Sequence, residues 1–242
     1  MEFKINYEKD KFNTSEEITI QDLNKRTIRT NKITFKVDAL DSKRKLKRDI
    51  KKVIKYRKWL EIKKEININV YNYKKDNLLI VNFVNLVEAI AKAKNIKDLY
   101  NRVYILACDY LDLHFYSKNV CDFCDNKCGG KQGTDSVTGC CHYFANPLGP
   151  LGFKYKLVTC KYLQEDGRCS VKSIGCKLFT CDYLNKKGIK FRIKDMFVLD
   201  TIFNPIQKIM LIIATYTPQE ITINKLLKVP NLKFRNKFFI NK

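Results

Sequence analysis

Nine of the chain's ten cysteines lie between residues 121 and 181, and this cluster constrains the fold more than any other feature. Metal binding needs several thiolates at one point, and a Cys-x2-Cys turn brings two together because the backbone folds back between them. We therefore expect an irregular, loop-rich segment over residues 117–190 that its ligands hold together. The candidate ligands are Cys121, Cys124, Cys128, Cys140, Cys141, Cys160, Cys169, Cys176 and Cys181.

The compartment decides how these cysteines are interpreted. No run reaches the roughly 18 apolar residues that a membrane-spanning helix needs, and charges interrupt the N-terminal stretch where a signal peptide has its apolar core. We therefore expect a cytoplasmic protein without a transmembrane segment. Because the cytoplasm keeps thiols reduced, metal ligation is favoured over disulfides. The disulfide interpretation returns if the protein is secreted by another route.

Zinc and iron–sulfur clusters both accept four thiolates. Cysteine-rich ligand sets select either of them, but nine cysteines exceed what one zinc ion uses. The spacing also lacks the paired Cys-x2-Cys motifs of a zinc ribbon. We favour an iron–sulfur cluster of the 4Fe-4S type, with zinc as the alternative. The order x2 then x3 after Cys121 reverses the one that loads a cluster for radical S-adenosylmethionine chemistry, so that chemistry is not expected.

The cysteine motifs resemble a known family. They are Gly139-Cys140-Cys141, then the stretch from Cys160 to Val171, which contains Gly-Arg-Cys-Ser-Val, and then Cys176-Lys-Leu-Phe-Thr-Cys181. Together they resemble the YkgJ-type CxxCxxCC proteins, whose domain is described as zinc- or iron-chelating and is similar to one in flagellin lysine N-methylases. The resemblance implies a role in protein modification and eight ligands, which are all the candidates except Cys128.

Three further residues bear on the site. Adjacent side chains point apart in an extended chain, so Cys140 and Cys141 serve one metal only where the backbone turns. His142 is interpreted as a loop imidazole before it is considered a ligand. Cys108 lies one helical turn from Tyr104 and is expected in the core. Catalytic residues are not predicted, and whether the chain is an enzyme stays open.

A second signal is a basic helix. Residues 43–64 hold twelve lysines and arginines against Asp49 and Glu61, within a net charge of +22. With Tyr56 and Trp59 among the charges, such a helix could bind phosphates and stack on bases. Alternatively, the helix binds an anionic membrane or an acidic protein surface, or it is simply a solvated face in a lysine-rich chain. The candidate contacts are Arg44, Lys47, Arg48, Lys51, Lys55, Arg57 and Lys58.

The apolar pattern predicts an α+β fold. Alternation over residues 3–7, 18–20, 33–37 and 66–70 predicts strands, and the apolar stripe of residues 42–64 predicts one helix. Further helices are expected over residues 78–93, over residues 96–115 behind an Asn95 cap, and behind caps at Asn204 and Thr217. We expect a β-containing basic region over residues 1–75 and a helical domain over residues 76–242 that encloses the cysteine segment.

Two function classes follow from these features. The first is a cysteine-ligated metalloprotein whose metal is structural or redox-active. The alternative is a nucleic-acid-binding protein in which the metal only holds the fold. The sequence does not indicate an oligomeric state.

Overall fold

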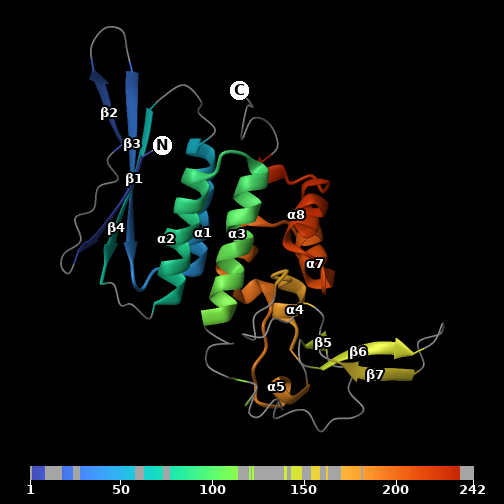
Figure 1. The fold of residues 1–242 in the computed structure, drawn as a ribbon. Helices are drawn as coiled ribbons and strands as arrows, with labels where there is room; N and C mark the ends of the chain where they lie inside the picture. The colour runs from blue at the N-terminus through green and yellow to red at the C-terminus, as the bar shows by residue number, and fades with distance from the viewer. Residues whose placement is uncertain are drawn as a thin grey trace. The chain divides into compact units, whose positions relative to one another are not determined.

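A computed structural model shows an α+β protein (Figure 1). The structure describes residues 2–8, 18–23, 28–57, 63–72, 77–113, 120, 122, 139–140, 143–148, 154–158, 162, 170–180 and 182–234. Within these ranges, only the backbone is described for residues 2–8, 18–23, 28–32, 56–57, 63–65, 139–140, 143–148, 154–158 and 182.

The chain forms two compact units. One comprises Met1–Val103 with Pro230–Lys242, and the other comprises Tyr104–Val229. These bounds differ from the expected regions 1–75 and 76–242, and that division stays a prediction.

The first unit contains a four-stranded sheet with the order β1-β4-β3-β2. Its strands are β1 (Glu2–Glu8), β2 (Ile18–Leu23), β3 (Ile28–Asp38) and β4 (Lys63–Tyr71). Strands β1 and β3 both run parallel to β4, whereas β2 is antiparallel to β3. The four predicted strands are therefore confirmed, but their order could not be taken from alternation alone.

Two helices pack beside this sheet (Figure 1). They are α1 (Lys43–Arg57) and α2 (Leu78–Lys92). Register pairs Phe35 with Ile68 and Val37 with Val70, and all four side chains are buried. These pairs form the sheet side of the core, because side chains that lie opposite one another in register share a face.

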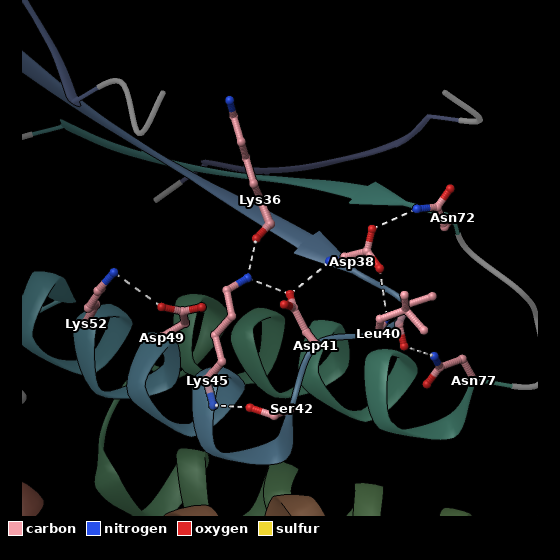
Figure 2. A network of polar contacts seen from close by, with 11 residues as sticks. Lys36, Asp38, Leu40, Asp41, Ser42, Lys45, Asp49, Lys52, Asn72 and Asn77 are labelled. Carbon is pink, nitrogen blue, oxygen red and sulfur yellow. Dashed lines mark hydrogen bonds and ion pairs between the residues drawn. The ribbon is translucent and has the colours of Figure 1, made fainter. Parts of the chain in front are cut away.

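A polar network fixes the chain where β3 and β4 end (Figure 2). The two carboxylate oxygens of Asp38 accept hydrogen bonds from the Leu40 backbone N–H at 2.8 Å and from Asn72 Nδ2 at 2.7 Å. Lys45 Nζ donates to the Asp41 carboxylate at 2.5 Å and to the Lys36 carbonyl at 3.0 Å. The start of α1 is thereby tied to the end of β3.

The predicted helix over residues 42–64 is wrong at its C-terminal end. Residues 63 and 64 begin β4, and α1 is described only to Arg57. Lysine is compatible with a helix or an exposed strand, so the basic run carried no boundary signal. The predicted apolar stripe is confirmed, because Leu46, Ile50, Val53 and Ile54 are all buried. Leu60, another apolar residue within the predicted helix 42–64, lies outside the described residues.

Helix α3 (Ile96–Leu111) begins at the predicted cap. Asn95 Oδ1 accepts from the Asp98 N–H, and the Asp98 carboxylate accepts from the Lys94 N–H, each at 2.8 Å. The α-helix is described to Leu111, residues 112–113 continue it with π-helical geometry, and residues 114–115 of the predicted helix lie outside the described residues. Leu113, which ends this continuation, is 63 % exposed.

The second unit holds a small antiparallel sheet and several short helices. The sheet has the order β5-β6-β7, with β5 at Gly139–Cys140, β6 at Tyr143–Leu148 and β7 at Lys154–Val158. The helices are α4 (Ile174–Leu178), α5 (Asp182–Lys186), α6 (Phe197–Ile202), α7 (Pro205–Ile213) and α8 (Gln219–Leu227). The expectation of a loop-rich segment therefore missed a three-stranded sheet within residues 117–190.

The two predicted helix caps near the C-terminus had different outcomes. Asn204 forms a full capping box with Gln207, and Pro205 occupies the first turn, as predicted. Thr217 does not cap α8, because its hydroxyl donates to the Thr215 carbonyl at 3.0 Å and Pro218 takes the cap position. Helix α7 also presents isoleucines on its outer side, and those more than half exposed are Ile206, Ile209, Ile212 and Ile213.

Candidate metal centre

The structure describes the side chain of one predicted ligand, Cys176, and the backbone of another, Cys140. The remaining candidates lie outside the described residues, as do His114 and His142. These candidates are Cys121, Cys124, Cys128, Cys141, Cys160, Cys169 and Cys181. Among the described residues, no three histidine, cysteine, aspartate or glutamate side chains gather as a metal site would require. The candidate centre is therefore built from Cys176 and from the segments that flank the other cysteines.

Cys176 lies in the middle of α4 and is partly exposed. Its Sγ accepts a hydrogen bond from the backbone N–H of Tyr216, with 3.1 Å between nitrogen and sulfur. Tyr216 has a φ of 54°, in the left-handed region that bulky residues rarely adopt. A backbone N–H is thus aimed at the sulfur by a turn in an uncommon conformation.

Close packing between α4 and the α7–α8 connection holds this turn in place. A Cβ added to Gly175 would lie 2.6 Å from the Ala214 carbonyl carbon and 2.7 Å from the Thr215 nitrogen. Only glycine permits so close an approach of two backbones. Ser173, which is 1 % exposed, donates its hydroxyl to the Ala214 carbonyl at 2.8 Å. The two segments are therefore joined on both sides of Gly175.

Tyr104 on α3 fixes the start of α4 from another direction. Its hydroxyl donates to the Lys172 carbonyl and accepts from the Ile174 N–H, both at 2.8 Å. Tyr104 is fully buried, and its bond from the Ile174 N–H is shielded from water. Lys172 has a φ of 48°, which makes it another non-glycine residue in the left-handed region. The chain between Ser170 and Cys176 is thus held in a defined path.

Cys108 lies in the core, as predicted. Its side chain is fully buried one turn after Tyr104, and burial raises the pKa of its thiol to about 12. Metal ligation requires a thiolate. Cys108 is therefore a protonated thiol of the core, whereas Cys176 is partly exposed.

Two described residues beside Cys160 and Cys169 are hydrogen-bonded to one another. The Ser170 N–H and hydroxyl both point to the Tyr162 carbonyl, at 2.9 and 3.1 Å. Tyr162 follows Cys160 by two residues, and Ser170 follows Cys169 directly. The described neighbours of these two cysteines therefore lie in direct contact.

A second contact joins the neighbours of Cys121 and Cys181. Lys187 Nζ donates to the Asp122 carboxylate at 2.7 Å and to the Val120 carbonyl at 3.3 Å, and the Tyr183 hydroxyl also donates to Asp122. The Lys187 ammonium lies 5.1 Å from the centre of the Tyr183 ring. Hydrogen bonds from Lys187 and then Tyr183 lower the pKa of Asp122, and the bond to Asp122 raises the pKa of Lys187. We call Asp122, Tyr183 and Lys187 the Asp122 clamp.

The backbone also turns near the adjacent cysteines. Strands β5 and β6 are antiparallel and pair Cys140 with Tyr143, so the chain reverses direction between these two residues. Such a reversal is the condition under which Cys140 and Cys141 can serve one metal. Whether both do so stays a prediction.

The described part of the basic helix forms a stripe of cations. Arg44, Arg48, Lys51 and Lys55 are exposed and follow one another at helical spacing of three or four residues. None of these four has an ion-pair partner among the residues that the structure describes, whereas Lys45 and Lys52 pair with Asp41 and Asp49. Lys47 is half-buried, the Arg57 side chain is not described, and Lys58 lies outside the described residues.

Comparisons with protein-family models, with curated proteins and with solved structures found no match to the chain. The resemblance to the CxxCxxCC proteins accordingly stays a prediction. Among the described residues, no helix is long and apolar enough to cross a lipid bilayer.

Sequence reasoning missed the residues that fix the site from outside the cysteine segment. Tyr104 had been considered only as a core neighbour of Cys108, and Tyr216 carried no signal because a backbone N–H is common to almost every residue. Gly175 lies inside the segment, where a glycine near cysteines indicates only that the backbone can accept a positive φ. The structure gives it another role, since positive φ among described glycines occurs at Gly188 only, and Gly175 permits close packing.

Proposed function

We propose that this chain is a cysteine-ligated metalloprotein whose centre lies in residues 117–190 and includes Cys176. The ligand set is drawn from the nine predicted cysteines, and the metal is an iron–sulfur cluster, with zinc as the alternative. The proposal places the protein in a reducing compartment such as the cytoplasm, where cysteines remain thiols.

The observation that carries the proposal is the hydrogen bond from the Tyr216 N–H to Cys176 Sγ. A neutral thiol is a weak acceptor, whereas a thiolate is a strong one whose hydrogen bonds are shorter. Backbone N–H groups aimed at ligating sulfurs orient the ligand and tune the metal. The left-handed turn at Tyr216 and the glycine contact at Gly175 hold this donor in place before any metal binds.

The contacts between flanking segments support convergence of the other cysteines. Ser170 bonds to Tyr162 beside Cys169 and Cys160, and the Asp122 clamp joins the flanks of Cys121 and Cys181. A centre with four thiolates needs such convergence, because its ligands are separated in sequence.

The test is to purify the protein without oxygen, measure iron, zinc and sulfide per chain, and record the visible spectrum. We expect bound iron and sulfide with visible absorption that a reductant bleaches if the cluster is redox-active. A colourless protein with stoichiometric zinc would select zinc. A folded protein without stoichiometric metal would refute the proposal, since metal binding should be coupled to folding of this segment.

Cys176 and Cys108 provide a matched pair of variants. We expect Cys176→Ser to lose metal, because a neutral hydroxyl replaces a ligating thiolate. Cys108→Ala should retain the wild-type metal content, because its protonated thiol is buried in the core. Equal metal content in the two variants would remove Cys176 from the ligand set.

A second candidate function is nucleic-acid binding through α1. The exposed stripe of Arg44, Arg48, Lys51 and Lys55 favours it, because cations exposed to solvent and without ion-pair partners among the described residues are available to phosphates. In this role the metal only stabilises the fold.

Fluorescence anisotropy with a short single-stranded oligonucleotide at several salt concentrations tests this role. We expect affinity to fall steeply with salt and the salt slope to decrease by about one for each cation changed to glutamine. The matched control is Lys52→Gln, which removes a cation of the same helix that already pairs with Asp49. No binding at low salt, or binding indifferent to salt, would refute the nucleic-acid role.

A further inference from the structure

The cation stripe of α1, which comprises Arg44, Arg48, Lys51 and Lys55, forms one narrow row along the helix. With 3.6 residues per turn and a rise of 1.5 Å per residue, the four side chains leave the helix within an arc of about 60° and extend over about 17 Å. All four are exposed, and every residue between 43 and 55 that is not buried is a lysine or an arginine. No acidic or apolar side chain of α1 therefore interrupts the row.

The carboxylates that contact α1 neutralise other cations than these four. Asp49 is the only acidic residue of α1, and it is buried and pairs with Lys52 at 3.3 Å (Figure 2). Asp41, which precedes the helix, pairs with Lys45. The cation stripe has no ion-pair partner among the residues that the structure describes, so its charge is left for another molecule.

The cation stripe works against the stability of the helix that carries it. Arg44 and Arg48 are four residues apart, as are Lys51 and Lys55, and like charges at this spacing destabilise a helix. The first turn of α1 also holds no acidic residue, although a carboxylate there would interact favourably with the helix dipole. An anion bound along the row relieves this repulsion.

The opposite side of α1 limits what kind of anion this is. Leu46, Ile50 and Val53 are fully buried in the core, and Ile54 is buried as well. A helix that lies on a membrane needs its apolar face for the lipid, and here that face is already used. Protein partners bind mainly through apolar or aromatic anchors, which the exposed side of residues 43–55 lacks. A nucleic acid fits better, because its phosphates supply a regular row of charges.

The shape of the row favours one strand over two. It is a single side chain wide, so it contacts the phosphates of one strand. Along a B-form duplex each strand has a phosphate every 3.4 Å, so about 17 Å corresponds to about five phosphates and half a helical turn. Over that length a duplex strand winds around its axis, whereas a single strand is free to straighten along α1.

We propose that the cation stripe binds one single strand of nucleic acid along its backbone, through about four consecutive phosphates and without reading base identity. This inference rests on the second candidate function, nucleic-acid binding, and deepens it by naming the ligand and the groups that hold it.

The first test measures fluorescence anisotropy of the full-length chain with three labelled probes of about 12 units each. They are oligothymidylate, an abasic phosphodiester strand of the same length, and a duplex. We expect the two single strands to bind with affinities within about threefold of one another and at least as tightly as the duplex. With four phosphate contacts on a single strand, affinity should fall about 50-fold between 50 and 200 mM salt.

The second test changes the cation stripe. We expect the variant with all four cations changed to glutamine to lose about 50-fold less affinity over the same salt range, because the four contacts are gone. Lys51→Gln should lower the salt slope by about one, whereas its neighbour Lys52→Gln should leave the slope unchanged, since Lys52 pairs with Asp49. The fourfold variant should unfold at a higher urea concentration than the wild type, because like charges are removed, so weaker binding does not reflect unfolding.

Several results would overturn the inference. Failure of the abasic strand to bind would show that the bases carry the binding, and tighter binding of the duplex would show that two strands are needed. An unchanged salt slope in the fourfold variant would place the contact elsewhere on the chain. Binding of phosphatidylserine vesicles without binding of either single strand would identify a lipid surface as the partner. No binding of any nucleic-acid or abasic probe at low salt would instead refute the nucleic-acid role itself, so the two failures are distinguishable.

Discussion

Replacing Gly175 with alanine tests the packing that aims the Tyr216 N–H at Cys176. The added Cβ would lie 2.6 Å from the Ala214 carbonyl carbon, whereas carbon atoms in contact are about 3.5–4.0 Å apart. The atoms it meets belong to backbone, so no side chain can rotate away. Helix α4 and the 214–216 turn must therefore separate by about 1 Å to reach ordinary contact.

The cost follows from this displacement. Overpacking of this kind costs about 1–3 kcal/mol, and alanine returns up to about 1 kcal/mol through its better helix propensity. We expect a net loss of about 1–2 kcal/mol in the free energy of unfolding. The same displacement lengthens the Tyr216 N to Cys176 Sγ distance from 3.1 Å and breaks that hydrogen bond. Metal affinity should then fall about tenfold, at the lower end of effects seen when an outer partner of a ligand is lost.

Gly188 supplies the control. It has a φ of 75° and nothing within 4 Å of the position where a Cβ would be, so alanine there costs backbone strain without any clash. That strain is worth about 1–2 kcal/mol, similar to the cost at Gly175. The two variants should therefore have similar stability but different metal affinity.

The assay is urea unfolding of the metal-loaded proteins without oxygen, together with metal transfer to a chelator. Wild-type stability and affinity in Gly175→Ala would show that the backbones do not approach as closely as described. Equal loss of metal from Gly188→Ala would show that affinity follows overall stability and not the Tyr216 donor.

Three further predictions concern residues around the site. Cys108 should resist iodoacetamide at pH 8 in the folded protein, because its thiol is buried with a pKa of about 12, and alkylation there by mass spectrometry would contradict this. The thiol pKa of Cys108 is about 12 in the folded protein and 9.0 in the unfolded chain, so its contribution to stability is complete below pH 9 and is lost as the pH rises to about 12. The Cys108→Ala variant should therefore lose less stability than the wild type over this pH range. Tyr104→Phe removes the hydroxyl that bonds to the Lys172 carbonyl and the Ile174 N–H, and it should lower the free energy of unfolding in urea by about 2 kcal/mol. An unchanged free energy of unfolding would mean that water replaces the hydroxyl. Asn204→Ala removes the cap of α7 and should cost about 1 kcal/mol, whereas the Thr217→Ala control should cost less because Thr217 caps no helix.

Local signals in the sequence predicted the regular elements well. Alternation identified all four strands of the first sheet, and the apolar stripe of α1 is buried as expected. The caps at Asn95 and Asn204 were predictable because a short polar side chain before an apolar helix has a defined hydrogen-bonding role. The same pattern misled at Thr217, whose hydroxyl bonds within the preceding turn. Boundaries in the lysine-rich stretch were not predictable, because exposed lysine is compatible with either state.

The cysteine pattern indicated a kind of site but not its arrangement. Spacing shows which thiolates are close along the chain, and the structure adds contacts across long separations, such as Asp122 with Lys187 and Ser173 with Ala214. Such contacts depend on tertiary packing, which leaves no periodic signal in a single sequence. Sheet β5-β6-β7 was missed for a related reason, since its strands are short and contain Pro147 and Gly139.

Uncommon backbone conformations occur close to the predicted metal ligands. Among the described residues, the non-glycine positions with positive φ are Asn72, Asp122, Lys172 and Tyr216. Asparagine tolerates this conformation, but in lysine and tyrosine it is energetically unfavourable. Such strain persists only where surrounding contacts impose it. Asp122 is next to Cys121. Lys172 lies four residues before Cys176 and its carbonyl accepts a hydrogen bond from Tyr104, and the Tyr216 N–H donates to Cys176 itself. Three of the four therefore lie near predicted ligands, Asp122 and Lys172 in sequence and Tyr216 through its hydrogen bond, as we expect if the fold holds these cysteines in fixed positions.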